Sequence, residues 1–558
     1  MDLLPEALEQ HRRHRYAEAE ALYRRILAER PEEPEALHML GVLAYQRGNA
    51  AAAIPLIQRS LALRPNHAEA LSNLGIALKS CGRIEEAVAA HRAAVRLAPK
   101  FVGARFNLAN ALQEGGRPAE AVEEYLQAAA IAPDHAGAFL NLGNALALTG
   151  RSQEAIAAYQ RHLALEPASP TGHLAFANLL RDLGRLDEAV AFYRRATDLK
   201  PSYAEAFSNL GVALRDQGRF DEAIAAYRTA IRLKPDFGEA HYSLAMGLLL
   251  RGDFAEGMKE HEWRWRTPRQ PPRRYPQPAW DGQRQLEKTL LLYAEQGLGD
   301  TILFARFAAE ARRRVGSLIL ECQAPLVPLL TGLSGVDRVV VQGEPPPAFD
   351  LHATLMSLAH LFGATLEGLK VGVPYVPPDP QRVARWRPRL ADGRGLKVGL
   401  VWSGNPSHGN DRRRSAPLDA LAPLRQVAGV TFYSLQLGPP PAGDSPLPIV
   451  HLGDDIADFA DTAAIMSMLD LVISVDTSTA HLAGALGRPL WVMLPTIPDW
   501  RWMLYRDDSP WYPSARIFRQ VEPGDWSELA TRMARHWPRR PAAHRPRDRR
   551  PPSWSPRA

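Results

Sequence analysis

Residues 202–235, SYAEAFSNLGVALRDQGRFDEAIAAYRTAIRLKP, form one copy of a 34-residue unit that recurs through the first half of the chain. Proline keeps this period at Pro31, Pro65, Pro99, Pro133, Pro167, Pro201 and Pro235. Glycine keeps it midway between the prolines, at Gly48, Gly82, Gly116, Gly150, Gly184, Gly218 and Gly252. Alanine follows five residues later at Ala53, Ala87, Ala121, Ala155, Ala189 and Ala223. This spacing predicts tandem helical hairpins, because glycine accepts the positive φ that ends a helix and alanine permits a close helix crossing.

The repeated unit resembles the tetratricopeptide repeat. Hairpins of this kind bury their apolar faces only against neighbouring hairpins, so they stack into a superhelix. We therefore expect about eight hairpins over residues 1–267, in an all-α solenoid with an irregular first copy and a last copy that runs through MKEHEWRWRT (258–267). The first helix of each pair should line the concave side, which we expect to bind a partner.

Asparagines recur on the predicted first helices. They form one row at Asn73, Asn107, Asn141 and Asn209 and a second row, three residues further on, at Asn110, Asn144 and Asn178. Because an amide both donates and accepts hydrogen bonds, such rows suit the capture of an extended chain. The phrases SNLGIALK, FNLANALQ, LNLGNALA and SNLGVALR resemble the repeats of O-linked N-acetylglucosamine transferases, which implies a ladder that holds an acceptor polypeptide. Ala175 and Ser243 interrupt the ladder, and the alternative is that the asparagines pack or bond between repeats.

After Arg266 the repeat gives way to a connector rich in proline and arginine, residues 268–285. Beyond it, short apolar runs alternate with helical stretches, a pattern typical of parallel sheets covered by helices on both faces. The strands are expected in TLLLYAE, SLILEC, DRVVVQG, FDLHATL, LKVGLVW, VTFYSLQ, DLVISVD and PLWVMLP. Two groups of about four strands, in residues 286–390 and 391–537, predict an α/β unit of two Rossmann-like lobes that bind ligands between their carboxyl-end loops.

Two of these loops have the character of anion sites. In AEQGLGDTILFARF (294–307), Gly297 and Gly299 permit close backbone approach at the start of a helix, where Asp300 is either functional or a helix cap. In LVISVDTSTAHLAGALGRPLWVMLP (471–495), Asp476, Thr477 and Ser478 open a helix that carries His481. Hydroxyls and unpaired amides at a helix start can hold a diphosphate, whereas the alternative is a capped helix with a core-facing histidine.

DTSTAHLAGALGRP (476–489) resembles the nucleotide-binding motif of glycosyltransferase family 9, the ADP-heptose:lipopolysaccharide heptosyltransferases. GLGDTILFARF (297–307) resembles that family's N-lobe loop, and LKVGLVWSGNPSHGNDRRRSAPLDAL (396–421) resembles the start of its C-lobe. The resemblance implies a GT-B fold, a sugar-nucleotide donor and an inverting transfer. It also implies that Asp300 is the general base and that Asp476, Thr477 and His481 contact the donor phosphates.

The remaining donor-site residues are expected in the loops after LKVGLVW and VTFYSLQ. They are Ser403, Asn405 and Arg414, with Gln436 as a neighbour. Ser478, at the helix start after DLVISVD, replaces the family's frequent glycine. Arg414 stands where the family usually has lysine, and no acidic residue matches the one expected after VTFYSLQ. Arg412, Arg413 and Arg414 suit a departing diphosphate or form a solvated basic loop. Trp500, Trp502, Trp511 and Tyr512 can stack on a base or sugar, or pack between the lobes.

No D-x-D motif occurs in the chain, so a transfer without metal is expected and no cofactor is predicted. Cys81 and Cys322 are the only cysteines and lie far apart, which indicates neither a disulfide framework nor a cysteine metal site. The first residues lack the apolar core of a signal peptide, and no apolar run reaches the roughly 18 residues of a membrane span. A cytoplasmic location is expected, with peripheral membrane association left open.

The 558 residues exceed one ordinary core, and their 46% hydrophobic and 23% charged composition is that of a folded chain. The net charge of +6 resides in residues 538–558, which hold seven arginines and one aspartate and are expected to be a disordered tail. The body is thus neutral, and we expect no nucleic-acid partner. The leading hypothesis is a glycosyltransferase whose solenoid recruits a protein or glycan acceptor. The alternative is a peptide-binding scaffold with a catalytically inactive transferase-like domain.

Overall fold

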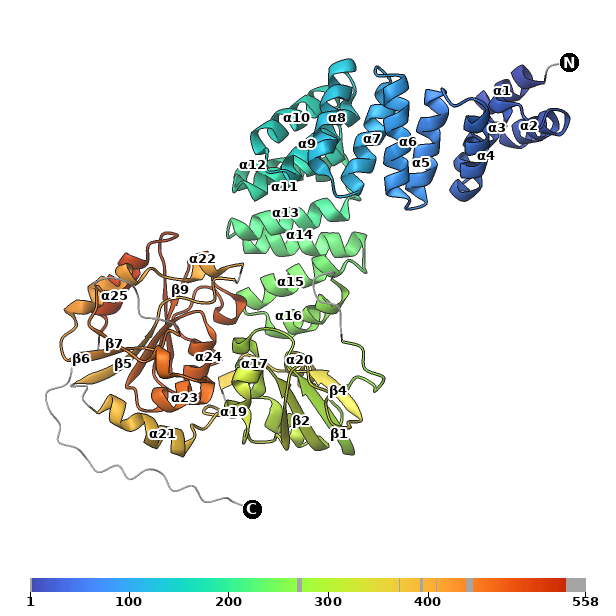
Figure 1. Cartoon of the computed structure of the whole chain (residues 1–558). Coiled ribbons are helices and arrows are strands. Elements are labelled where there is room, and N and C mark those ends of the chain that lie inside the picture. Colours follow the sequence, from blue (N-terminus) through green and yellow to red (C-terminus); the bar gives the residue numbers. More distant parts are fainter. Residues whose placement is uncertain are drawn as a thin grey trace. The chain divides into compact units, whose positions relative to one another are not determined.

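The computed structural model describes residues 3–267, 273–370, 372–391, 395–407, 409–437 and 445–537. The chain divides into two compact units, Met1–Pro235 and Asp236–Ala558 (Figure 1). The predicted tail (538–558) and residues 268–272 of the predicted connector lie outside the described residues. None of the described helices combines the length and the apolar character needed to cross a membrane.

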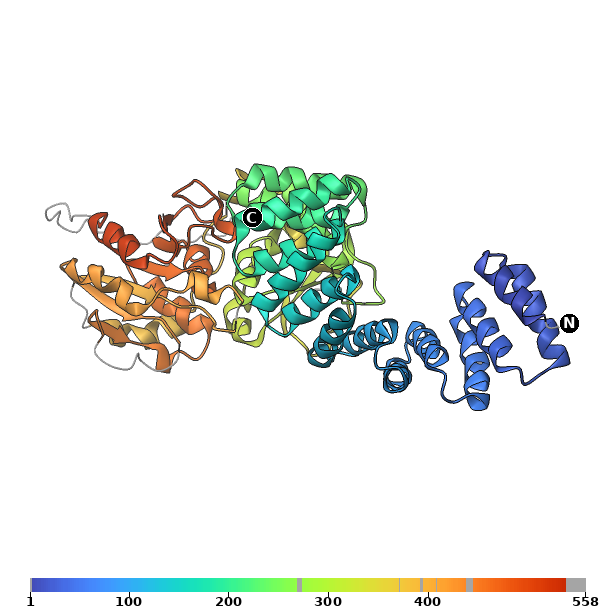
Figure 2. The same cartoon turned by 90° about the horizontal axis from the view of Figure 1, so that it is seen from above.

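The first unit is all-α. Its described residues form α1 (Leu4–Arg12), α2 (Tyr16–Glu29), α3 (Pro34–Gln46), α4 (Ala50–Leu63), α5 (Ala68–Ser80), α6 (Ile84–Leu97), α7 (Val102–Glu114), α8 (Pro118–Ile131), α9 (Ala136–Leu148), α10 (Ser152–Leu165), α11 (Pro170–Asp182), α12 (Leu186–Leu199), α13 (Ala204–Asp216) and α14 (Phe220–Leu233). Each odd-numbered helix packs against the next to form a hairpin, and each hairpin packs against the following one (Figures 1 and 2). The predicted all-α repeat solenoid is confirmed.

The periodic glycines and alanines explain this regularity. The glycines between the two helices of successive hairpins, from Gly48 to Gly218, have φ between 73° and 83°, a region that side chains with a Cβ avoid. The periodic alanines, from Ala53 to Ala223, are at most 1% exposed. The turn and the crossing that the period predicted are therefore both present.

The second unit opens with one more helical pair, α15 (Gly238–Arg251) and α16 (Phe254–His261), followed by the 3₁₀ helix η1 (Glu262–Arg266). Together with the first unit, residues 4–261 thus contain eight helical pairs, all within the described part of the chain. The division at Pro235 falls one hairpin before the predicted end of the solenoid at residue 267. The last hairpin is therefore compactly joined to the α/β part.

Two parallel sheets form the rest of the second unit. The strands are β1 (Gln285–Tyr293), β2 (Val315–Cys322), β3 (Arg338–Val341), β4 (Leu351–Thr354), β5 (Leu396–Val401), β6 (Val430–Ser434), β7 (Ile449–His451), β8 (Leu471–Val475), β9 (Leu490–Leu494) and β10 (Ala515–Arg519). Among the described residues their orders are β3-β2-β1-β4 and β10-β9-β8-β5-β6-β7, and every pairing is parallel. The eight expected strands are present, and the α/β class is confirmed. β7 and β10 were not expected, because both are short edge strands whose runs are weakly apolar.

Helices cover both sheets, which is why central strands such as β9 are buried along their whole length. The helices of the described α/β part are α17 (Leu298–Ala305), α18 (Ala308–Arg312), α19 (Val327–Leu330), α20 (Ser357–Leu361), α21 (Pro380–Trp386), α22 (Asp411–Arg414), α23 (Phe459–Ser467), α24 (Ser478–Ala485) and α25 (Trp526–Arg535). α21 lies in the proline-rich segment that separates the two sheets, and Arg382 ties it to Asp458 on the second sheet's side (2.7 Å). α17 packs against α24, so the two sheets meet through the helices that follow β1 and β8.

Candidate functional site

The strand orders locate the crevice of each sheet. In the first sheet the chain runs from β1 through β2 to β3 and then returns to the other side of β1 as β4. In the second it runs from β5 to β7 and then returns beside β5 as β8. Parallel α/β sheets bind ligands outside the carboxyl ends of the strands where the order reverses in this way. The loops after β1, β5 and β8 are therefore the positions to inspect.

All the residues predicted for the donor site follow these three strands. Gly297, Gly299 and Asp300 follow β1; Ser403, Asn405 and Arg414 follow β5; and Asp476, Thr477, Ser478 and His481 follow β8. Gly299 brings the first and last groups together, since a Cβ on it would lie 2.8 Å from Cδ2 of His481 and 3.4 Å from Cα of Ser478. The loops of the two sheets are thus in direct contact, and this contact requires glycine.

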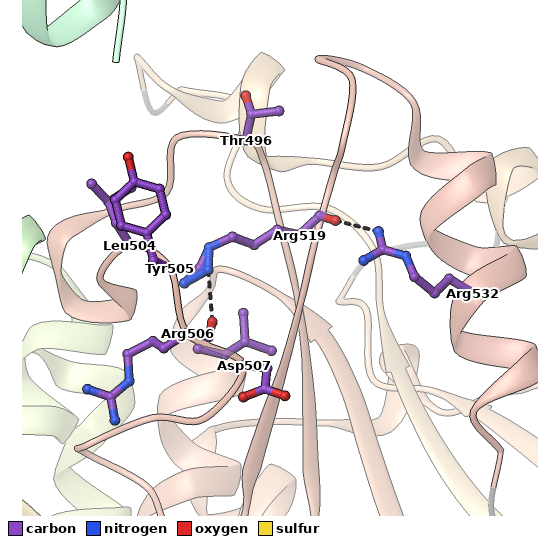
Figure 3. Close-up of a pocket in the computed structure, with 8 residues that line it drawn as sticks. Thr496, Leu504, Tyr505, Arg506, Asp507, Arg519 and Arg532 are labelled. Carbon is purple, nitrogen blue, oxygen red and sulfur yellow. Dashed lines mark hydrogen bonds between the residues drawn. The ribbon is translucent and has the colours of Figure 1, made fainter. Parts of the chain in front are cut away.

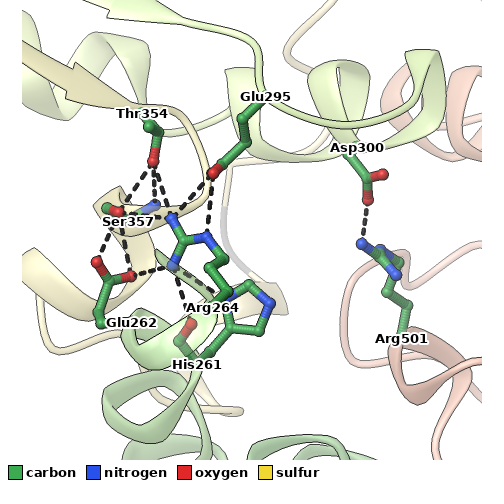
Figure 4. Close-up of polar contacts among 8 residues, drawn as sticks. All are labelled: His261, Glu262, Arg264, Glu295, Asp300, Thr354, Ser357 and Arg501. Atoms are coloured by element: carbon green, nitrogen blue, oxygen red, sulfur yellow. Dashed lines mark hydrogen bonds and ion pairs between the residues drawn. The ribbon is translucent and has the colours of Figure 1, made fainter. Parts of the chain in front are cut away.

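Asp300 has two partners. Its Oδ2 accepts a hydrogen bond from the Gly297 amide (3.2 Å), as an acidic residue in the first turn of a helix often does. Its Oδ1 forms an ion pair with Arg501, which comes from the second sheet's side (Figure 4). Arg501 also binds Asp499 (2.7 Å). Burial raises the pKa of Asp300, and Arg501 opposes that rise. Asp300 therefore caps its helix and also faces the other lobe.

Asp476 and His481 are held by aromatic residues. Trp502 donates its indole N–H to Oδ1 of Asp476 (2.8 Å) and stacks on the His481 ring, with centroids 5.3 Å apart. Nδ1 of His481 lies 3.0 Å from the Tyr512 hydroxyl. Burial lowers the pKa of His481 to about 3, so the imidazole is neutral at physiological pH. A neutral imidazole can contact a phosphate as a hydrogen-bond donor but not as a cation.

The arginine run divides into two parts. Arg412 and Arg413 are exposed, as predicted for a solvated basic loop. Arg414 is half-buried, pairs with Asp411 (3.3 Å) and donates to the main-chain oxygen of Asp476 (3.0 Å). Its guanidinium lies so near the backbone that a Cβ on Gly404 would come within 2.6 Å of Nη2. Arg414 is thus the arginine of the three that reaches the loop after β8.

The other predicted neighbours mainly shape these loops. Gln436 accepts from the Ser403 amide (3.2 Å), so it joins the loops after β5 and β6. Asn405 accepts from the amide and hydroxyl of Ser407 (3.0 and 2.9 Å). The hydroxyl of Thr477 lies 3.1 Å from that of Ser474. The four aromatic residues Trp500, Trp502, Trp511 and Tyr512 are at most 5% exposed, so they pack within the unit and do not present a free face to a base.

Asp476 provides a pH test of this geometry. Burial, with the nearby charge of Asp499, raises the pKa of Asp476 to about 6. A raised acid pKa means that folding favours the protonated form, so this contribution is present below about pH 4 and is lost as the pH rises through 6. The variant Asp476→Asn keeps an oxygen for Trp502 and lacks the charge. As the pH rises from 4 to 7, we expect the free energy of unfolding of Asp476→Asn to increase by roughly 1–3 kcal/mol relative to that of the wild type.

Denaturant unfolding of both proteins at several pH values measures this difference. The exposed Asp507 offers a matched control variant, Asp507→Asn. A constant stability difference between Asp476→Asn and wild type across this range would contradict a raised pKa of the Asp476 carboxyl in the folded protein.

The sequence did not point to Arg501, Asp499 or a cluster around Arg264. Arg264, in η1, is 1% exposed and donates to both carboxylate oxygens of Glu295 (3.0 Å each). It also donates to Glu262 (2.7 Å), Thr354 (3.0 Å) and Ser357 (2.9 Å; Figure 4). Glu295 follows β1 and Thr354 ends β4. Arg264 therefore connects the ends of the two strands between which the strand order of the first sheet reverses. No local sequence pattern distinguishes it from the neighbouring arginines.

A pocket of about 270 Å³ lies elsewhere in the second unit (Figure 3). It is lined by Thr496, Leu504, Tyr505, Arg506, Asp507, Ile517, Arg519 and Arg532. Arg519 donates there to the main-chain oxygens of Trp502, Met503 and Arg506 (2.8, 2.6 and 3.1 Å), so its charge braces the loop. The pocket contains none of the predicted site residues and lies beside β9 and β10.

The asparagine rows are partly tied into the solenoid. Asn141 donates to Asn110 and Asn209 donates to Asn178, both at 2.9 Å, and each bond joins neighbouring hairpins. Tyrosines of the second helices also donate to this second row: Tyr125 to Asn110, Tyr159 to Asn144 and Tyr193 to Asn178 (2.6, 2.7 and 2.6 Å). Asn73 pairs with His38 (3.0 Å), and Asn107 lies on α7. All seven amides remain partly exposed. The asparagines therefore do form hydrogen bonds between repeats, as the alternative predicted. These bonds mainly use the side-chain oxygens of the second row, such as those of Asn110 and Asn178.

The family model described as tetratricopeptide repeat matches residues 4–68, 38–100, 72–136, 106–172, 174–236 and 210–262. The protein therefore consists of a tetratricopeptide-repeat array followed by an α/β unit with two parallel sheets. All six matches end at or before residue 262, so they do not concern the sheets.

Among curated proteins, the chain is similar to Protein FlbA of Caulobacter vibrioides, with 31% identity over 287 residues. The match covers 46% of this chain and 47% of FlbA, so the chain spans about half the length of that relative. Among solved structures, it is similar to the C-terminal part of a TPR repeat-containing protein from Cytophaga hutchinsonii (18% identity, TM-score 0.36, covering 43% of this chain and 98% of that one). It is also similar to TTC0263, a thermophilic TPR protein in Thermus thermophilus (28% identity, TM-score 0.27, covering 32% and 98%).

Proposed function

We propose that this protein is a glycosyltransferase of the GT-B type, which moves a sugar from a nucleoside-diphosphate sugar to an acceptor recruited by the repeat solenoid. The observation that carries the proposal is the convergence of the loops after β1 and β8, where Gly299 lies against His481. A site between two parallel sheets, formed from the loops at their reversal points, suits a ligand with two ends such as a sugar nucleotide.

The proposed reaction is an inverting displacement. The acceptor hydroxyl oxygen attacks the anomeric carbon, the bond from that carbon to the diphosphate oxygen breaks, and Asp300 takes the hydroxyl proton. Arg414 and the amides at the start of α24 steady the departing diphosphate. The diphosphate would also compete with Asp300 for Arg501, and exchange of that arginine onto phosphate would free the carboxylate to act as a base. No metal is needed for this step.

For the acceptor, we propose the partly exposed amides of the solenoid. Among the bonds made by the described residues, Tyr125 and Asn141 occupy the oxygen of Asn110, and its NH₂ group remains to donate. The same holds at Asn178 with Tyr193 and Asn209. Amide groups that are already oriented by such bonds lose little freedom when a peptide binds, which favours capture of an extended chain.

The second candidate is a peptide-binding scaffold with an inactive α/β unit. Two observations favour it: Arg501 holds Asp300, and no acidic residue in the loop after VTFYSLQ matches the one that the resembling family has there. In both candidates the solenoid binds the partner, so binding and hydrolysis of a sugar-nucleotide donor distinguish them.

The test is to titrate the purified protein with UDP-, GDP-, ADP-, CDP- and dTDP-sugars by calorimetry and to measure slow hydrolysis of any donor that binds. The enzyme proposal requires one donor to bind and its hydrolysis to depend on Arg414, with Asp507→Asn as a control outside the site. If no donor binds, the transferase proposal fails and the scaffold remains.

The solenoid has its own prediction. The double variant Asn107→Ala, Asn141→Ala should bind an extended-peptide array at least tenfold more weakly, because two amides are lost, while donor hydrolysis stays the same. Tyr125→Phe is the matched control, since it removes one bond to Asn110 and leaves the row of amides in place. Equal peptide binding by the double variant and the wild type would reject the ladder.

A further inference from the structure

Three side chains with metal-binding atoms meet in the first unit, where the second hairpin packs against the third. Glu35 and His38 lie three residues apart on α3, and His67 directly precedes α5. One ligand atom from each lies within 4.8 Å of the other two. The distance from Oε1 of Glu35 to Nδ1 of His38 is 3.9 Å. These atoms come from two hairpins, so no local spacing in the sequence indicated them.

His38 has an unsatisfied nitrogen aimed at this point. The residue is 2% exposed, and its buried Nδ1 has no hydrogen-bond partner among the described residues. Such an atom is uncommon in a folded protein and calls for a ligand. The other nitrogen, Nε2, lies 3.0 Å from the amide nitrogen Nδ2 of Asn73, and the nitrogen and oxygen of such an amide exchange places when it turns by 180°. When that amide presents its oxygen, Nε2–H donates to it and the lone pair of Nδ1 faces Glu35 and His67.

The other hairpin junctions provide an internal comparison. The positions of Glu35, His38 and His67 recur in successive repeats as Glu69, Ser72, Phe101; Gly103, Phe106, His135; Gly137, Leu140, Ser169; Thr171, Leu174, Tyr203; and Glu205, Ser208, Phe237. Phe106 and His135 contact each other at the matching positions, with ring centroids 5.0 Å apart as in the pair of His38 and His67, and with an interplanar angle of 38° in place of 76°. Two aromatic rings are thus enough to pack this junction, and packing alone does not explain two histidines with a glutamate.

We propose that Glu35, His38 and His67 bind a divalent transition-metal ion, with Zn²⁺ as the ion of best fit, which ties the second hairpin to the third. Two imidazoles and a carboxylate are ligands that Zn²⁺ takes at about 2.0–2.2 Å, and they suit it better than Mg²⁺ or Ca²⁺. The half-exposed side chains of Glu35 and His67 close the remaining distance. A fourth position stays open to water or to a side chain of a bound partner.

Among the described residues, only one oxygen of the Glu35 carboxylate is paired with a side chain of opposite charge. Arg64 approaches Oε2 of Glu35 (3.4 Å) and leaves Oε1 to the ion. The site departs from the expectation, based on the missing D-x-D and the scarce cysteines, that the chain binds no metal. It is also independent of the proposed transfer reaction.

The test uses the full chain, freed of metal with a chelator. Calorimetric titration with ZnCl₂ should give one Zn²⁺ per chain, and Mg²⁺ and Ca²⁺ should give no signal. His67→Ala and Glu35→Gln should each weaken Zn²⁺ binding at least tenfold. Asn73→Ala, which removes only the partner of a ligand, should weaken it by roughly 10–100-fold. His135→Ala is the matched control and should bind Zn²⁺ as the wild type does.

Because Glu35 and His67 are partly exposed, their variants should keep the helical circular dichroism of the wild type. Zn²⁺ should also raise the thermal midpoint of the wild type and not that of His67→Ala, since an ion that binds the native state stabilises it. The proposal is overturned if the metal-free protein does not bind Zn²⁺. Equal Zn²⁺ affinity in the wild type, His67→Ala and Glu35→Gln would overturn it as well.

Discussion

Replacing Arg264 with alanine is expected to destabilise the second unit by about 3–5 kcal/mol, because it leaves buried charge without compensation. The side chain of Glu295 is only 4% exposed, and both of its oxygens accept from Arg264. Burial already raises the pKa of Glu295, and the guanidinium opposes that rise. Thr354 and Ser357 lose a donor in the same variant.

The measurement is denaturant unfolding followed by tryptophan fluorescence. All twelve tryptophans of the chain lie after residue 262, so the signal reports on the second unit alone. Arg266→Ala is the matched control: Arg266 is exposed, and its loss should cost less than about 1 kcal/mol. The double variant Arg264→Met, Glu295→Leu should lose much less stability than Arg264→Ala, since it removes both charges of the buried pair and leaves only the partly exposed Glu262 without its arginine. A small effect of Arg264→Ala, comparable to that of Arg266→Ala, would contradict this role.

Replacing Asp300 with asparagine is expected to lower sugar transfer by roughly 10²–10⁴-fold, because the amide cannot take the proton of the acceptor hydroxyl. Asparagine retains an oxygen for the Gly297 amide, so the start of α17 should stay intact. Donor affinity should therefore change little while the rate falls. Single-turnover transfer and calorimetric donor binding, compared in both proteins, measure the two effects separately.

Asp499 supplies the control, because it also pairs with Arg501 and has no proposed proton to take. Asp499→Asn and Asp300→Asn each remove one negative charge from the same arginine. If both variants lose transfer equally, Asp300 acts only by holding Arg501 and is not the base. A rate that is unchanged in Asp300→Asn would remove it from the mechanism altogether.

Much of the fold could be predicted from sequence because its determinants are local. The glycine period requires a positive φ at each hairpin turn, and these turns carry it. The alternation of apolar runs and helical stretches placed eight strands in their order. β7 and β10 were missed because both are short edge strands: β7 has only three residues, none of them fully buried, and β10 carries arginines among its buried residues. The division at Pro235 was missed because α15 and α16 repeat the solenoid pattern while packing with the α/β part.

The candidate site could be predicted in part for the same reason. The loop residues follow strands, and parallel strands bring their carboxyl ends to one edge, so Asp300 and Asp476 could be placed near a crevice from sequence. Arg501 could not, because it lies 201 positions from Asp300. Arg264 could not, because its partners Thr354 and Ser357 lie 90 and 93 positions away.

The sequence by itself determined a solenoid built on a 34-residue period and an α/β unit with glycine-rich and hydroxyl-rich loops, since backbone conformation and apolar periodicity are set within a few residues. Only the tertiary structure decided which charges those loops meet: Arg501 on Asp300, Arg264 on Glu295, and His38 beside Glu35 and His67. Such pairs depend on how distant elements pack. Burial then sets their energies, because a charge or a lone nitrogen removed from water must find its partner inside the protein.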